Sequence, residues 1–187
     1  MNMLSTSTQR TAIVDGVDGG DLRARLERHH LESFGWARSC CRQDPDEAEN
    51  VLQAVYLKIF ERKAVFDGRA SFRTWLFAVI RMTTAEMRRR NLLQRLSLLR
   101  YHETEARPAP PGSPEQAAFH AEVRTKFRSL LAALPRRQSE VLQLVFYHDL
   151  SLAEAALVLG ISVGSARTHY ERGKNRLRAK MKEAGVR

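Results

Sequence analysis

The sequence of 187 residues contains two cysteines, Cys40 and Cys41, which are adjacent. Neighbouring residues on a helix point in different directions and rarely meet disulfide geometry, so the pair excludes a disulfide framework. It also excludes a zinc site built from cysteines, and the histidines lack metal-ligand spacing. We therefore expect no metal and no other cofactor, and a protein that resides in a reducing cytoplasm. Redox sensing by the pair stays open as an alternative.

Long apolar runs are also lacking. No run approaches the roughly 20 residues that a membrane-spanning helix needs, so we expect no membrane partner. Residues 1–20 have no basic region followed by an apolar core, which excludes a secretory signal, and we expect a flexible lead there.

Acidic residues are too few to balance the basic ones. The chain has 21 Asp and Glu against 31 Lys and Arg, which gives a formal net charge of +10 and an isoelectric point near 10.3. Such an excess indicates a polyanionic partner, and without a membrane segment that partner is nucleic acid.

Residues 151–182 carry the strongest local pattern. Ser151 and Glu154 have the spacing of a capping box, which predicts a helix start. Gly160 suits the end of that short helix, and Ser162 can cap a second, longer one. A short helix, a glycine turn and a long basic helix are typical of a DNA-binding helix-turn-helix. The alternative is a helical hairpin whose basic face only meets water.

The second of these helices has one apolar stripe and a cationic remainder. The stripe consists of Val163, Ala166, Tyr170, Gly173, Leu177 and Met181. The other faces carry the side chains that we expect to meet DNA, including Arg167, Thr168, His169, Arg172, Lys174 and Arg176.

The first half of the chain predicts three helices. One runs from about Asp21 to Arg42, and a second begins after Asp44, a helix cap followed by Pro45. The acidic residues from 44 to 49 would suit a metal-dependent nuclease, but carboxylates in a first turn also complement the helix dipole. The third helix opens at Ser71.

Side-chain spacing divides the second and third of these helices into faces. The second exposes Glu49, Asn50 and Gln53. The third buries Phe72, Trp75, Leu76, Val79, Ile80 and Thr83. Phe66 and Phe77 lie off the buried stripe, so both could stack on unpaired bases.

A proline-rich segment separates the two halves. Four of the six prolines stand at positions 108, 110, 111 and 114. Such a segment predicts an extended tether. We expect an all-α chain of two small helical domains, 21–92 and 114–187, joined by a flexible linker at 93–113. The second domain should add helices at 114–133 and after Pro135 before its helix-turn-helix.

With both halves in view, residues 21–187 resemble the extracytoplasmic-function (ECF) group of bacterial RNA polymerase sigma factors. The first half matches that family with Ala48-Glu49-Asn50-Val51-Leu52-Gln53-Ala54-Val55-Tyr56, Phe72-Arg73-Thr74-Trp75-Leu76 and Arg88-Arg89-Arg90. The second half matches with Leu134-Pro135, Val141 and the run from Gly160 to His169.

The resemblance implies a transcription initiation factor and not an enzyme. Core RNA polymerase, through its beta-prime clamp and beta flap, would be one partner and promoter DNA another, with an anti-sigma factor as a third. The polymerase-binding residues would be Glu49, Asn50, Gln53 and Tyr56. The minus-ten element would be bound by Phe66, Arg69, Ser71, Arg73, Met82, Arg88 and Arg89. The minus-thirty-five element would be read by the helix-turn-helix at 151–178, through Arg167, Thr168, His169, Glu171, Arg172, Lys174 and Arg176. The protein would be cytoplasmic and nucleoid-associated.

Three residues depart from the family pattern. Asn50 replaces an acidic residue, Met82 stands where asparagine is usual, and His169 stands where arginine is usual. Three alternatives remain: a helix-turn-helix regulator that never contacts core polymerase, the nuclease, and a sigma-like interaction partner without promoter activity.

Overall fold

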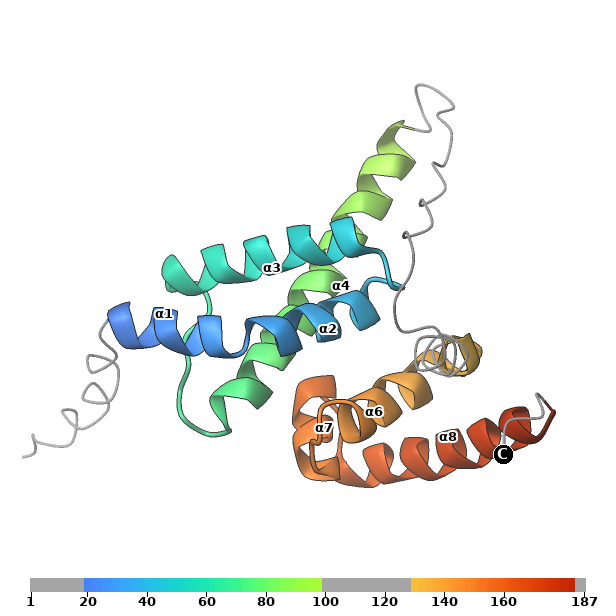
Figure 1. Cartoon of the computed structure of the whole chain (residues 1–187). Helices are drawn as coiled ribbons and strands as arrows, with labels where there is room; N and C mark the ends of the chain where they lie inside the picture. Colours follow the sequence, from blue (N-terminus) through green and yellow to red (C-terminus); the bar gives the residue numbers. More distant parts are fainter. Residues whose placement is uncertain (1–18, 99–128, 184–187) are drawn as a thin grey trace, which may run out of the picture.

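The computed structural model describes residues 19–98 and 129–183, and every regular element in these ranges is an α-helix (Figure 1). The first unit consists of α1 (Gly19–Arg28), α2 (His30–Cys40), α3 (Pro45–Phe60) and α4 (Phe72–Leu98). The second consists of α6 (Arg136–Phe146), α7 (Leu152–Leu159) and α8 (Val163–Glu183). The all-α prediction is confirmed; the predicted linker and the helix predicted at 114–133 lie almost wholly outside the described residues.

Helix caps decide where the elements begin and end. Asp44 accepts hydrogen bonds from the backbone N–H groups of Asp46 and Glu47, and Pro45 is the first residue of α3. Ser151 and Glu154 form the predicted capping box of α7, and Gly160 ends that helix with φ +60°. Ser162 Oγ accepts from Ser165 N at 3.1 Å, which caps α8.

The prediction of one helix from about Asp21 to Arg42 is wrong, because the helix breaks at His29 and α2 begins at His30. In α3, Glu47 pairs with α4, its Oε1 lying 3.5 Å from Arg88 Nε. At the end of α6, Phe146 is 51% exposed whereas Leu144 is buried.

Helix α4 differs most from its prediction. It continues to Leu98, past residue 92, where the predicted domain ends. Phe77 is fully buried on this helix, stacked against Trp36 with ring centroids 6.0 Å apart. The prediction that Phe77 could stack on bases is therefore wrong: α2 covers the side of α4 that the spacing alone left open.

The core of the first unit lies between α2, α3 and α4. Leu52, Val55, Leu76 and Ile80 are almost completely buried there. The helix-turn-helix unit packs against the same region, because α7 lies on α4 and α6 touches α2. Both cysteines are buried; burial raises the pKa of Cys41 to about 11 and that of Cys40 further, which keeps both as thiols.

Candidate nucleic-acid interface

The N-terminal half of α8 presents a cationic face to solvent. Arg167, Thr168, Glu171 and Arg172 are all exposed. Within the described part of the chain, Arg167 and Arg172 have no hydrogen-bond or ion-pair partner. Both guanidinium groups are therefore available to a phosphate or a base edge.

The opposite face of α8 fixes the helix on α6 and α7. Ala166 and Leu177 are buried, and Gly173 lies where α6 approaches most closely. A Cβ at Gly173 would lie 3.0 Å from Leu142 Cδ1, so any larger residue here would require α6 to give way by a few tenths of an ångström. Val163, which was predicted to belong to the apolar stripe of this face, is instead 46% exposed.

Thr168, Glu171, Lys174 and Arg176 on α8 have partners inside the chain. Thr168 Oγ1 donates to the carbonyl of Gly164 at 3.0 Å. Lys174 lies 3.0 Å from Glu171 and over the ring of Tyr170, 5.0 Å from its centroid. Arg176 donates to Gln138 Oε1 at 3.3 Å and ties α8 to α6. His169 is half-buried.

The residues predicted to capture the minus-ten element lie along the 66–71 loop and α4. Phe66 packs on Phe72 and Trp75, with both centroid distances 5.4 Å, so its ring is half-buried in an aromatic cluster. Arg69 is strongly exposed and pairs with Asp67 at 3.2 Å. Ser71 Oγ accepts from Thr74 N at 3.1 Å, which makes it the cap of α4.

Further along α4 the predicted residues separate into exposed and internal ones. Met82 is 60% exposed, and Arg89 is also exposed. Arg73 is largely covered and lies 3.8 Å from Glu32. Arg88 donates to the carbonyl of Cys40 and pairs with Glu47. The structure thus leaves Met82, Arg69 and Arg89 open to a ligand and uses Arg88 to join three helices.

A separate face of α3 carries the predicted polymerase-binding residues. Glu49, Asn50 and Gln53 are exposed, and Gln53 donates to Glu49 at 3.4 Å. Tyr56 lies further along the same face, is half-buried, and shares a hydrogen bond of 3.0 Å with His30 Nδ1. Burial raises the pKa of Tyr56.

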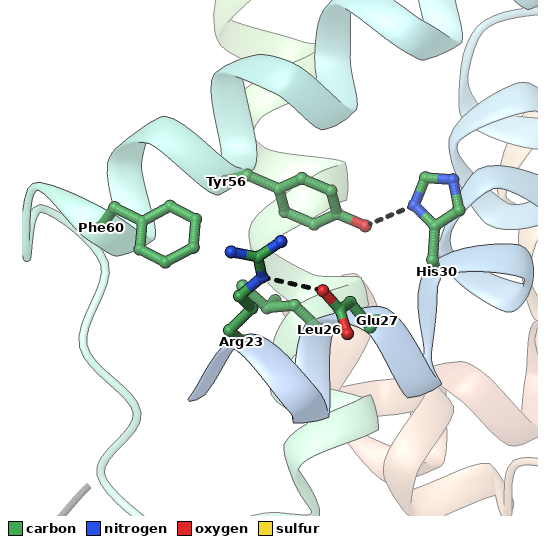
Figure 2. Close-up of a pocket in the computed structure, with 6 residues that line it drawn as sticks. All are labelled: Arg23, Leu26, Glu27, His30, Tyr56 and Phe60. Atoms are coloured by element: carbon green, nitrogen blue, oxygen red, sulfur yellow. Dashed lines mark hydrogen bonds and ion pairs between the residues drawn. The ribbon is translucent and has the colours of Figure 1, made fainter. Parts of the chain in front are cut away.

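A pocket of about 570 Å³ opens between α1 and α3, next to Tyr56. Figure 2 shows its lining of Arg23, Leu26, Glu27, His30, Tyr56 and Phe60. Arg23 is held over the pocket by Glu27 at 2.9 Å, and Phe60 is 56% exposed at its rim. Sequence reasoning missed this apolar end of the α3 face; the i, i+4, i+7, i+11 spacing of positions 49, 53, 56 and 60 could have revealed it.

Among the described residues, no helix is both long and apolar enough to cross a bilayer. The described residues also contain no group of three or more His, Cys, Asp or Glu placed to hold a metal ion. In the acidic start of α3, Asp44 serves as a helix cap and Glu47 as an ion-pair partner.

Known proteins resemble both units of the chain. Residues 26–92 match the family described as sigma-70 region 2, and residues 124–177 match sigma-70, region 4. The ECF RNA polymerase sigma factor SigF of Caulobacter vibrioides is 32% identical over 97% of this chain and 99% of its own length. SigW of Bacillus subtilis, another ECF sigma factor, is 25% identical over 73% of this chain and 76% of its own.

Two solved structures share the fold. One is the sigma factor RpoE in complex with the anti-sigma factor NepR from Bartonella quintana, with a TM-score of 0.63 at 24% identity, covering 87% of this chain and 97% of RpoE. The other is CnrH in complex with the cytosolic domain of CnrY, with a TM-score of 0.61 at 22% identity, covering 89% of this chain and 90% of CnrH. The near end-to-end match to SigF, with the two sigma-70 regions in order on two helical units, shows that this chain belongs to the ECF group of the sigma-70 family of RNA polymerase sigma factors.

Proposed function

We propose that this chain is a promoter-specific initiation factor that binds core RNA polymerase and directs it to minus-ten and minus-thirty-five elements, without catalysing a reaction itself. The observation that carries the proposal is the face of α8, where Arg167 and Arg172 extend to solvent from a helix braced by α7. Family membership supplies the context, since this unit matches sigma-70 region 4.

The helix-turn-helix unit is the reader of duplex DNA. Its α8 enters the major groove of the minus-thirty-five element with its N-terminal half, where Arg167, Thr168, Glu171 and Arg172 face outward. His169, Lys174 and Arg176 flank this face and are closer to backbone phosphates than to bases in this arrangement.

The first unit captures the melted minus-ten element. Arg69 and Arg89 supply exposed positive charge, and Met82 supplies an exposed apolar surface between them. Methionine offers only a weak acceptor, so shape and stacking, and not hydrogen bonds, select the base at this position. Phe66, Ser71, Arg73 and Arg88 complete the site by holding the loop and α4 in place.

The α3 face docks on the beta-prime clamp of core polymerase. Glu49 and Gln53 contribute polar contacts. Asn50 contributes a neutral contact where an acidic residue is usual. Tyr56 lies at the end of this face and lines the pocket of Figure 2. The helix-turn-helix unit contacts the beta flap. Because the structural neighbour RpoE is bound to an anti-sigma factor, we include an anti-sigma factor among the partners. As a promoter-binding protein, the active chain would reside on the nucleoid.

The test is core-polymerase retention by the wild-type chain and by Glu49→Lys, followed by run-off transcription on a randomised promoter library. Repulsion at an interface can cost several kcal/mol, so Glu49→Lys should lose most retention. Glu61→Lys is the matched control, because Glu61 is exposed on the same segment but lies off the Glu49–Tyr56 face and pairs with Lys63. Equal retention by both variants would remove the α3 face from the proposal. Tight duplex binding without any polymerase retention would instead support the regulator that acts alone.

A further inference from the structure

Three arginines from two helices converge on one carboxylate, and we call these four residues the arginine cluster. On α6, Arg136 Nε lies 2.9 Å from Glu140 Oε1, and Arg137 Nη1 lies 3.3 Å from Glu140 Oε2. Arg81 Nη2, on α4, lies 3.7 Å from the same Oε2. Within residues 19–98 and 129–183, no ion pair joins these arginines to another carboxylate. Three cations therefore share one anion, and two positive charges stay uncompensated.

The arginine cluster has a buried floor and an open rim. Glu140 and Arg81 form the floor, with 8% and 16% of their side chains exposed, whereas Arg136 and Arg137 are 56% and 42% exposed. Arg81 Nε is buried and has no hydrogen-bond partner in the described part of the chain. A buried polar group without a partner destabilises the protein, because it has lost its hydrogen bonds to water. The floor therefore has a donor that an incoming anion could satisfy.

The electrostatics of Arg81 also favour an added anion. Burial is the largest cause of its lowered pKa; Glu140 raises this pKa, and Arg137 and Arg136 lower it further. Cys40 lies near enough to be influenced by Glu140, Arg81 and Arg136, but burial raises its pKa and keeps the thiol neutral. One carboxylate thus acts on Arg81 against two guanidinium groups and burial. A bound anion would stabilise its charged form.

The start of α6 supplies further donors. Pro135, its N-cap, provides no side-chain cap, and the backbone N–H groups of Arg136 and Arg137 have no acceptor among the described residues. Helical side chains tilt toward the N-terminus, so the carboxylate of Glu140 lies over this first turn. Unpaired N–H groups at a helix N-terminus favour a negative charge. Backbone and guanidinium donors therefore lie at the same end of α6.

Other helices hold the two sides of the arginine cluster in place. Both α2 and α7 pack on α4 and also on α6. Trp36 Nε1 on α2 donates to the carbonyl of Phe77 at 3.0 Å, which fixes α2 on α4 one turn before Arg81. A site whose groups are already positioned loses less conformational freedom when a ligand binds.

We propose that the arginine cluster binds the terminal phosphate group of a small molecule, which bridges α4 and α6. A terminal phosphate carries a charge of about −1.5 to −2 at neutral pH and several acceptor oxygens, which matches the two uncompensated cations. Guanidinium groups also bind phosphate oxygens through paired hydrogen bonds. A backbone phosphate of nucleic acid carries one negative charge and would neutralise only half of the excess. This site does not depend on the proposed function.

The test is a calorimetric titration of the full chain with inorganic phosphate, at constant ionic strength maintained with chloride. The rim variant, Arg136→Gln with Arg137→Gln, removes the two exposed guanidinium groups and leaves the floor unchanged. The matched control, Arg28→Gln with Arg62→Gln, removes the same charge from two exposed positions of the first unit.

The parent and the control should bind phosphate at one saturable site with the same affinity. The rim variant should bind at least about tenfold more weakly, because each lost guanidinium removes a charge-assisted hydrogen bond. No saturable binding by the parent, or equal binding by all three proteins, overturns the site, since phosphate would then meet only the general positive charge. If the rim variant loses helix content by circular dichroism, the single change Arg136→Gln decides by the same comparison.

A second titration separates a small ligand from nucleic acid. Duplex DNA of random sequence replaces phosphate, and fluorescence anisotropy measures its binding. The rim variant and the control should lose DNA affinity equally, because both remove two positive charges. A larger loss in the rim variant would overturn the assignment to a small molecule and make the arginine cluster a contact for a nucleic-acid backbone.

Discussion

Replacing Gly173 with alanine tests how closely α8 packs on α6. The added Cβ would lie 3.0 Å from Leu142 Cδ1 and 3.1 Å from Gln138 Cβ. Carbon atoms in contact prefer about 3.5–4.0 Å. Leu142 is fully buried and the Cβ of Gln138 is fixed to the backbone of α6, so the two helices must move apart.

Two opposing effects set the size of the change. Overpacking of a well-packed core costs about 1–3 kcal/mol. Alanine in a helix is favoured over glycine by about 1 kcal/mol. The net of the two effects is about 0–2 kcal/mol, so we expect Gly173→Ala to lower the free energy of unfolding of the helix-turn-helix unit by up to about 2 kcal/mol.

Gly164→Ala on the same helix provides the matched control, because its nearest neighbour is Ser162 Oγ at 3.9 Å, an ordinary contact. The free energy of unfolding of the Gly164→Ala variant should rise slightly or stay unchanged. Both free energies come from urea unfolding of the full chain, followed by circular dichroism. If Gly173→Ala proves as stable as Gly164→Ala, the close approach of α6 and α8 described above is wrong.

Three further predictions concern DNA and pH. If the Arg167 side chain contacts a base, Arg167→Ala should reduce transcription through the loss of about 1–3 kcal/mol of binding free energy, for cognate minus-thirty-five sequences only. Run-off assays in which every template keeps full activity would exclude Arg167 from the interface. Met82→Asn should sharpen base preference at one minus-ten position, since asparagine adds a donor and an acceptor; identical profiles on four templates would show that Met82 does not face the captured base. Where the helix-turn-helix unit packs on α2 and α4, burial lowers the pKa of His148 to about 4, so this packing is strongest above pH 6.5 and weakens as the pH falls towards 4. The packing should weaken by about 2 kcal/mol, roughly 20-fold, between pH 7 and pH 5; energy transfer between dyes on Lys63→Cys and Lys182→Cys measures this, and a response that persists in His148→Phe would contradict it.

Local signals in the sequence predicted the ends of helices well. The capping box at Ser151, the cap at Asp44 and the left-handed Gly160 follow from side chains within a few residues of one another, so spacing alone is sufficient. The exposed residues of α8 and α3 also follow from helical periodicity. Their assignment to promoter DNA and to core polymerase came from the family resemblance.

Contacts between distant segments escaped prediction. Phe77 lies off the apolar stripe of its helix, and only the arrival of α2 and His148 explains its burial. Arg88 belongs to a basic run typical of DNA binding, yet its guanidinium joins α4 to Cys40 and Glu47. Periodicity predicts which face of a helix is apolar, but it does not say which second element will cover a mixed face.

Glu140 has a consequence for how strongly the helix-turn-helix unit is held on the first unit. It pairs with Arg81 across the two units, but also with Arg136 at 2.9 Å and Arg137 at 3.3 Å on its own helix. A buried carboxylate that loses its sole partner is heavily penalised. Glu140 would keep two cationic partners if the Arg81 contact were lost, and Arg81 would return to water, so neither unit would retain an orphan charge. The pair across the units therefore selects one orientation of contact without making the loss of that contact prohibitive.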